Sequence, residues 1–135
     1  MRRYLLDTGI ASHYMNRRKG VYLRAQAEVQ KGNFIGVCVP VLAELHYGAE
    51  NSQSSDRNLK LLRRTLKSWR IWPVTLSTAM AYGRLAAHLH QVGRPMQQFD
   101  ILIATTALDL GNCTVVSMDT DFDAVEGLDV ENWAI

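Results

Sequence analysis

Short runs of β-branched and apolar residues alternate along this chain with longer stretches in which apolar positions recur at helical spacing. The apolar runs cover residues 3–6, 35–39, 71–74, 114–118 and 128–130, and the helical stretches cover 10–15, 21–31, 40–49, 56–69, 77–92 and 100–110. Strands that alternate with helices are typical of right-handed β–α–β units. The sequence therefore predicts an α/β fold with a central, mainly parallel sheet of four to five strands, in a single domain over residues 1–135.

The clearest helical pattern covers residues 56–69, where an apolar set and a basic set repeat on different faces. The apolar set is Leu59, Leu62, Leu66 and Trp69, and the basic set is Arg57, Lys60, Arg64 and Lys67. We expect the apolar set to pack in the core and the basic set to face solvent. Ser77 is a predicted N-cap, and Gly111 follows a predicted helix end.

Four carboxylates stand where apolar segments end or begin. Asp7 and Asp119 directly follow predicted strands. Glu44 lies one turn into the helix after the second strand, and Asp100 opens the helix 100–110. Because parallel sheets bind ligands at the carboxyl ends of their strands, we expect these acids to meet in one pocket. Four acids in one pocket need a cation, and all-carboxylate sites suit Mg²⁺ or Mn²⁺, so the pattern predicts a divalent metal site.

Each acid also has a purely structural explanation. Asp7 and Asp100 could be N-caps, Glu44 could be a solvated helix residue, and Asp119 could belong to a turn. Zinc is disfavoured because it prefers His or Cys ligands, and the two most closely spaced histidines, at 88 and 90, point to different helix faces.

Composition is that of an ordinary globular protein, with 47% apolar and 21% charged residues. The apolar run near the N-terminus has only three residues, too few for a signal peptide, and no later run is long enough to span a bilayer. Cys38 and Cys113 lie in β-like runs, so we expect two reduced core thiols rather than a disulfide. These features predict a cytoplasmic protein with no membrane contact.

Charge is distributed unevenly. All 15 Lys and Arg residues lie at or before Arg94, together with only five acids, so this part carries +10. The last 41 residues hold eight acids and no basic residue, and carry −8. A basic surface beside an acidic pocket suits a polyanionic substrate with a metal, although mutual neutralisation of the two parts explains the charges equally well.

The triplet Asp7-Thr8-Gly9 resembles the active-site loop of retroviral-type aspartic proteases. That fold is nearly all β with a glycine-rich flap, so the predicted helices argue strongly against it. The sequence contains no Gly-x-Ser-x-Gly elbow, phosphate-binding Gly-rich loop or Cys-x-x-Cys motif.

Six motifs, in this order and spacing, resemble those of the PIN-domain ribonucleases, in particular the VapC toxins of bacterial toxin–antitoxin pairs. They are Tyr-Leu-Leu-Asp-Thr (4–8), Leu-Ala-Glu-Leu-His-Tyr-Gly (42–48), Gly-Arg-Pro (93–95), Phe-Asp-Ile-Leu-Ile-Ala (99–104), Val-Val-Ser-Met-Asp-Thr-Asp-Phe (115–122) and Gly-Leu-Asp-Val-Glu-Asn-Trp (127–133). The resemblance extends from the first strand to the C-terminus.

The resemblance implies a three-layer α/β/α fold and a Mg²⁺- or Mn²⁺-dependent endoribonuclease that acts as a toxin, hydrolysing RNA with a metal-activated water. Carried over by position, the acidic quartet of catalytic residues and metal ligands is Asp7, Glu44, Asp100 and Asp119. Asp121 resembles a further acid beside the metal, and Thr8 and Ser117 match hydroxyl residues that support the site. The resemblance also implies a cognate antitoxin, a homodimer, and contact with DNA only through the antitoxin.

One position departs from the family pattern. The family most often has Asn where this chain has Gly9, so a polar side chain close to the metal is missing. This departure keeps open the alternative of a catalytically weakened PIN-like binding module. A separate alternative is another Mg²⁺-dependent nuclease or phosphatase on a similar sheet. Candidates for RNA contact are Arg94, in the loop that leads to Asp100, together with Arg17 and Arg18.

Overall fold

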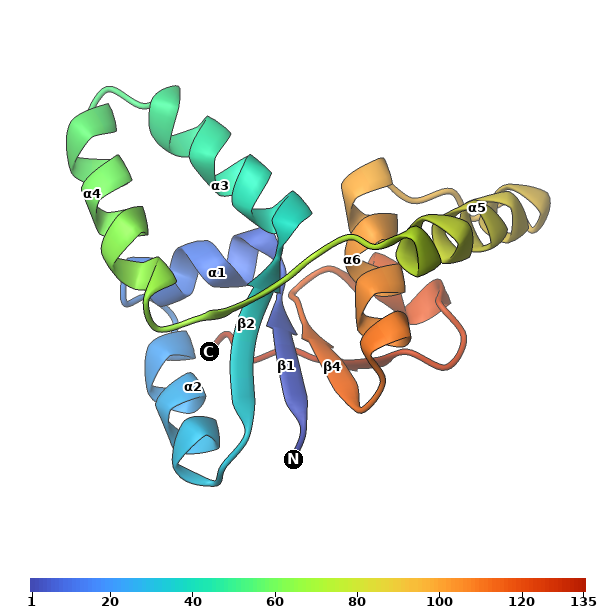
Figure 1. Cartoon of the computed structure of the whole chain (residues 1–135), viewed down its shortest axis with the longest axis horizontal. Coiled ribbons are helices and arrows are strands. Elements are labelled where there is room, and N and C mark those ends of the chain that lie inside the picture. The colour runs from blue at the N-terminus through green and yellow to red at the C-terminus, as the bar shows by residue number, and fades with distance from the viewer.

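The computed structural model describes all residues from 1 to 135 and contains five strands and six α-helices (Figure 1). The strands are β1 (Arg3–Leu6), β2 (Phe34–Cys38), β3 (Arg70–Trp72), β4 (Cys113–Val116) and β5 (Asp129–Glu131). The helices are α1 (Thr8–Met15), α2 (Val21–Gln30), α3 (Val39–Glu50), α4 (Ser55–Leu66), α5 (Leu76–Gln91) and α6 (Gln98–Leu110), and a short 3₁₀ helix, η1 (Thr120–Ala124), precedes β5. None of the helices has the length and apolar content that a membrane span requires.

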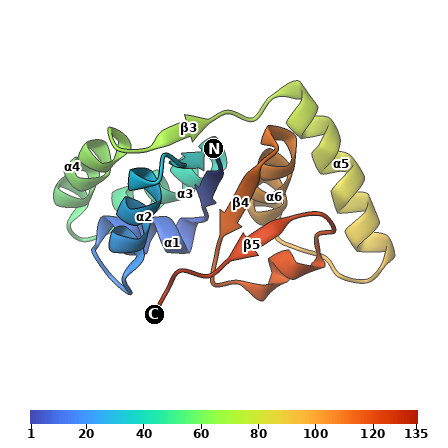
Figure 2. The same cartoon turned by 90° about the horizontal axis from the view of Figure 1, so that it is seen from below.

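The five strands form one parallel sheet in the order β3-β2-β1-β4-β5. The chain runs outward from β1 through β2 to β3, then returns to the other side of β1 to form β4 and β5. Right-handed crossovers therefore place α1 to α4 on one face of the sheet and α5 and α6 on the other. Figures 1 and 2 show these two groups of helices on opposite sides of the molecule. The predicted three-layer α/β/α fold with a parallel sheet is confirmed.

The core is centred on β1 and β4, the two middle strands. Leu5, Leu6, Val115 and Val116 have no exposed surface, as expected for a parallel sheet that is covered on both faces. Phe122 of η1 is also fully buried in this cluster. Burial of this apolar surface is the main force that holds the layers together.

Both cysteines are free and buried, as the sequence predicts. Burial raises the pKa of Cys38 to about 11 and that of Cys113 to about 12. Both thiols are therefore protonated and unreactive at neutral pH.

A cluster of charged and polar side chains links α2 to β5. Glu28, only 3% exposed, accepts hydrogen bonds from Arg24 Nε at 3.1 Å and from Asn33 Nδ2 at 3.0 Å. Arg24 also donates to Glu131, which accepts a second hydrogen bond from the indole of Trp133. Burial alone would raise the pKa of Glu28, but the hydrogen bonds and the nearby positive charges outweigh it and lower this pKa.

Several predicted helix ends are wrong by two or three residues. Thr75, not Ser77, is the N-cap of α5, and the Ser77 hydroxyl instead donates to Asp109 on α6 at 2.6 Å. The helix predicted to reach Trp69 ends at Leu66, and Trp69 packs in the core beyond it. These ends depend on contacts between distant segments, which no local pattern contains.

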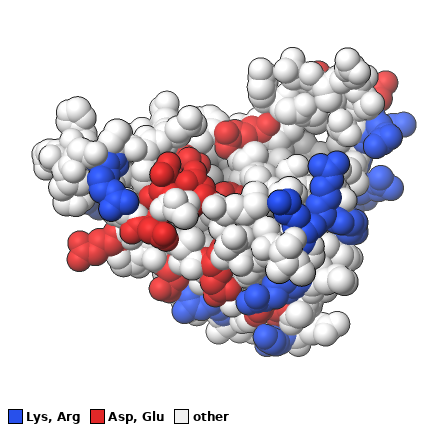
Figure 3. Space-filling view, turned by 180° about the vertical axis from the view of Figure 1, so that it is seen from behind, with Lys and Arg blue, Asp and Glu red and all other residues white.

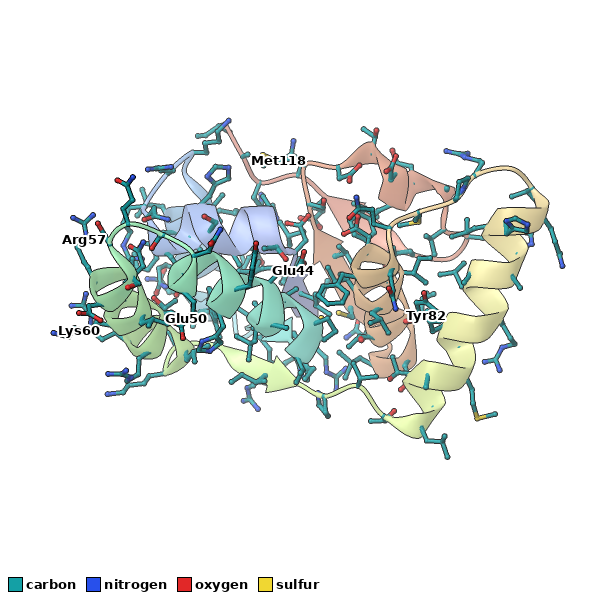
Figure 4. All side chains as sticks on the ribbon, turned by 90° about the horizontal axis from the view of Figure 1, so that it is seen from above. Glu44, Glu50, Arg57, Lys60, Tyr82 and Met118 are labelled. Carbon is teal, nitrogen blue, oxygen red and sulfur yellow. The ribbon has the colours of Figure 1, made fainter.

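The amphipathic pattern of α4 is otherwise confirmed. Leu62 and Trp69 are buried, Leu59 and Leu66 are partly buried, and the four basic residues are exposed. In Figure 4, Arg57 and Lys60 project from the outer side of the helix. The basic set therefore faces solvent, as predicted.

Candidate active site

The candidate site lies at the ends of β1 and β4, where the order of the strands along the sheet reverses. β1 leads to β2 on one side, whereas β4, its neighbour on the other side, is reached only after β3. In open parallel sheets the crevice at the carboxyl ends of two such strands is the usual place for ligands. Asp7 directly follows β1, and Ser117 and Asp119 follow β4. The backbone N–H of Asp7 donates to the carbonyl of Val116 at 3.1 Å, which fixes the two strand ends side by side.

Asp7 is both a helix cap and a member of this crevice. Its Oδ1 accepts a hydrogen bond from the backbone N–H of Ile10 at 2.9 Å and so caps α1. Its Oδ2 accepts a hydrogen bond from the hydroxyl of Ser117 at 2.5 Å, and that hydroxyl accepts one from the N–H of Asp119 at 2.9 Å. Burial nevertheless raises the pKa of Asp7, and the charges of Asp119 and Glu44 raise it further.

Glu44 reaches the same place from α3. Its Oε1 accepts a hydrogen bond from the hydroxyl of Thr8 at 2.6 Å, so the residue after Asp7 holds the Glu44 carboxylate. Figure 4, seen from above, shows Glu44 on the part of α3 that lies toward the middle of the molecule. The alternative that Glu44 is merely a solvated helix residue is therefore wrong, since its side chain is partly buried and accepts a hydrogen bond from Thr8 of α1.

Among the acids at this crevice, Asp100 has the most strongly raised pKa. It lies in the first turn of α6, whose N-cap is Gln97, so the alternative that Asp100 is itself the cap is wrong. Its pKa is raised to about 6, first by burial and then by the negative charges of other carboxylates. In order of effect, these are Asp119, Asp7, Glu44 and Asp121. These four acids are near enough to Asp100 for their charges to raise its pKa.

Asp119 and Asp121 form the exposed side of the site. Oδ1 of Asp119 accepts a hydrogen bond from the backbone N–H of Asp121 at 2.9 Å and caps η1. Both side chains are exposed, unlike those of Asp7 and Asp100. The turn predicted as the structural explanation of Asp119 is thus present, and it also places both acids near Asp100.

The residues fit a hard divalent cation in their chemistry. As the side chains stand, no three of them converge on one point at metal-ligand spacing. Asp7, Glu44 and Asp119 are instead each held by an internal hydrogen bond. However, none of the four ion pairs in the molecule involves these acids, so their charge is not neutralised by Lys or Arg. An uncompensated set of carboxylate oxygens suits Mg²⁺ or Mn²⁺.

The predicted RNA-contact residues differ in their surroundings. Arg17 is engaged within the protein, because its guanidinium lies 3.3 Å from the ring centroid of Tyr22 and donates to the carbonyl of Tyr14. Arg18 and Arg94 are exposed and have no ion pair. Figure 3 shows acidic side chains gathered on one face of the molecule with basic side chains on either side of them.

Comparisons with known proteins agree with this geometry. The model of the PIN domain matches residues 4–128, and the chain belongs to the PIN-domain family. Within that family it is of the VapC type. It is 30% identical over 130 residues to ribonuclease VapC2 of Rickettsia felis, covering 96% of this chain and 97% of that protein. It is also 30% identical over 136 residues to the tRNA(fMet)-specific endonuclease VapC of Shigella flexneri, covering 99% and 100%.

Solved structures show the same fold. The crystal structure of VapBC2 from Rickettsia felis, bound to a DNA fragment from their promoter, matches with a TM-score of 0.90 at 30% identity. The match covers 97% of this chain and 98% of that one. DNA-bound VapBC from Salmonella typhimurium matches with a TM-score of 0.90 at 25% identity, covering 99% and 100%.

Proposed function

We propose that this chain is a Mg²⁺- or Mn²⁺-dependent endoribonuclease and the toxin of a toxin–antitoxin pair. The observation that supports this most directly is that Asp100, whose pKa is raised first by burial and then by the charges of four other acids, lies in a set of carboxylates that form no ion pair with Lys or Arg. Such an arrangement is unfavourable to the fold on its own, and it becomes favourable when a cation is bound. The names of the relatives, which are ribonucleases and endonucleases, support the reaction class.

The roles of the residues follow from their surroundings. Asp7 and Asp100, both partly buried, would hold the metal directly, with Glu44 as a ligand or as the base that orients water. Asp119 would complete the site, and Asp121 would add negative charge at its exposed side. Thr8 and Ser117 fix the carboxylates of Glu44 and Asp7 through their hydroxyl groups. When bound, the metal would lower the pKa of the attacking water and offset charge on the phosphate.

The proposed partners are an RNA substrate, a cognate antitoxin and a second copy of the chain. The solved relatives are complexes named VapBC, which supports an antitoxin for this protein. Two of those complexes hold DNA, and we propose that this protein meets DNA only through the antitoxin. We also propose that the chain forms a homodimer and that it cleaves RNA in the cytoplasm.

The decisive experiment compares wild type with Asp100→Asn on total cellular RNA, with Mg²⁺ and with EDTA, and maps the cut ends. We expect cuts with 5′-phosphate and 3′-hydroxyl ends from the wild type in Mg²⁺ alone. Asp109→Asn is a matched control, since Asp109 lies on the same helix but its carboxylate accepts hydrogen bonds from α5. Equal cutting by Asp100→Asn, or cutting that persists in EDTA, would contradict the proposal. No cutting by the wild type on any RNA would favour the binding module.

The departure at Gly9 has a direct test. Gly9 lies in the first turn of α1 with no positive φ, and a Cβ there would meet only Met118 Cε at 3.6 Å and Asp7 Oδ1 at 3.8 Å. A side chain therefore fits. We expect Gly9→Asn to cleave RNA about two- to tenfold faster than Gly9→Ala, the range that one hydrogen bond provides. Equal rates for the two variants would mean that Thr8 and Ser117 already provide the missing polar contact.

A further inference from the structure

Recesses border the acidic site on both sides. The first is a groove of about 440 Å³ between α1, α3 and α4. Its lining includes the exposed Arg18 and Arg57 and the partly buried Met15, Asn58 and Leu61. Thr8 also lines it, and because the Thr8 hydroxyl donates to Glu44, the groove is next to the acidic site. No local sequence pattern indicated this groove, since its two arginines belong to different parts of the chain.

The second recess lies at the other side of the acidic site. It has a volume of about 280 Å³ and is formed by the loop 93–96 against η1. Arg94 and Asp121 both line it, so this recess also borders the acids. Figure 1 shows α1, α3 and α4 on one side of strands β1 and β4, and α5 and α6, which the loop joins, on the other side.

The arginines of both recesses are available to a ligand. Arg18, Arg57 and Arg94 are exposed, and none has an ion pair or a side-chain hydrogen bond within the protein. By contrast, Arg2 and Arg24 are paired with acids. A free guanidinium binds phosphate with two parallel hydrogen bonds, so each recess suits one phosphate of a polyanion.

We propose that a single strand of RNA lies across the site, with backbone phosphates at Arg18 and Arg57 on one side and at Arg94 on the other. The phosphate to be cut then lies between them, at the acids, and this inference rests on the proposed ribonuclease function. A single strand fits better than a duplex, because Asp7 and Asp100 are partly buried and a flexible backbone can bend down to them. The apolar side chains in the lining of the groove, such as Met15 and Leu61, offer contact to sugars or bases.

The test measures RNA binding without cleavage, in the full-length chain carrying Asp100→Asn. Fluorescence anisotropy with a labelled single-stranded RNA of mixed sequence is recorded over a range of salt concentrations. Arg18→Ala with Arg57→Ala should weaken binding and reduce the slope of log K against log salt by about 1.4, and Arg94→Ala should reduce it by about 0.7. Replacing the same residues with Lys should retain most of the slope.

Matched controls use exposed arginines outside both recesses. Arg63→Ala removes the same charge from α4, and Arg84→Ala removes it from α5, so both should leave the slope unchanged. An unchanged slope in both groups of recess variants would overturn the inference, even if wild type cuts RNA as proposed. Tighter binding of a duplex of the same length would also overturn it. If the Arg18 and Arg57 changes weaken binding of the antitoxin but not of RNA, the groove binds the antitoxin and the inference is overturned.

Discussion

Burial of Asp100, together with repulsion from the acids around it, predicts that the metal-free protein becomes more stable when this acid is neutralised. A rise in pKa from 3.8 to about 6 corresponds to about 3 kcal/mol of unfavourable energy for the charged form. Because the side chain is partly exposed, solvent screens the repulsion and reduces the net effect to about 1–1.5 kcal/mol. Asp100→Asn should therefore raise the free energy of unfolding by that amount, and the melting temperature by about 3–8 °C.

The sign of the pH dependence follows from the direction of the shift. Since the folded-state pKa of Asp100 is higher than the unfolded value, the folded protein binds this proton more tightly. The corresponding stability is fully present below the unfolded value of 3.8 and is lost as the pH rises through about 6. The advantage of Asp100→Asn should therefore be greatest above about pH 7 and should disappear near pH 4.

The assay is urea denaturation in EDTA, followed by the fluorescence of the buried residues Trp69 and Trp133. Added Mg²⁺ should stabilise the wild type and leave Asp100→Asn unchanged, because only the wild type retains the complete set of acids. Asp109→Asn, the control on the same helix, should gain no stability. If Asp100→Asn is less stable than the wild type in EDTA at alkaline pH, the carboxylates do not repel one another and the reasoning fails.

Three further predictions concern the support of the site and the fold. Ser117→Ala removes a hydrogen bond that lowers the pKa of Asp7, so the acid limb of the profile of RNA-cleavage rate against pH should move to higher pH. An acid limb that does not move would show that Ser117 does not control the protonation of Asp7. Gly36→Ala should destabilise the protein by about 1–3 kcal/mol in urea, since its Cβ would collide with the backbone carbonyl oxygen of Arg70 in β3. Gly48→Ala, with open space around it, should not destabilise the protein. Glu28→Gln should lower the free energy of unfolding at neutral pH but not in acid. Because the folded-state pKa of Glu28 is lowered, its contribution to stability is present above pH 4.5 and is lost as the pH falls through the folded-state value. Acid denaturation curves of the wild type and the variant that stay parallel would contradict this.

The sequence predicts those parts of the site that depend on local geometry. Asp7 directly follows β1 and Asp119 lies three residues past the end of β4, and a parallel sheet brings the carboxyl ends of adjacent strands together whatever the intervening sequence. The position of Glu44 depends on how α3 packs, yet its spacing from the second strand already places it near the same edge. The groove beside Thr8 was not predictable in this way, because it exists only where three helices from separate segments meet.

The structural and functional explanations of Asp7 turn out to be compatible. A carboxylate has two oxygens, and here Oδ1 caps α1 while Oδ2 bonds to Ser117. The cap fixes the rotation of the carboxylate, so the same interaction that begins the helix also aims the second oxygen into the crevice. One side chain can therefore cap α1 and also present an oxygen to the crevice. The structural explanation of Asp7 does not exclude its proposed role as a metal ligand. The same holds for Asp119, whose cap of η1 fixes it beside Ser117.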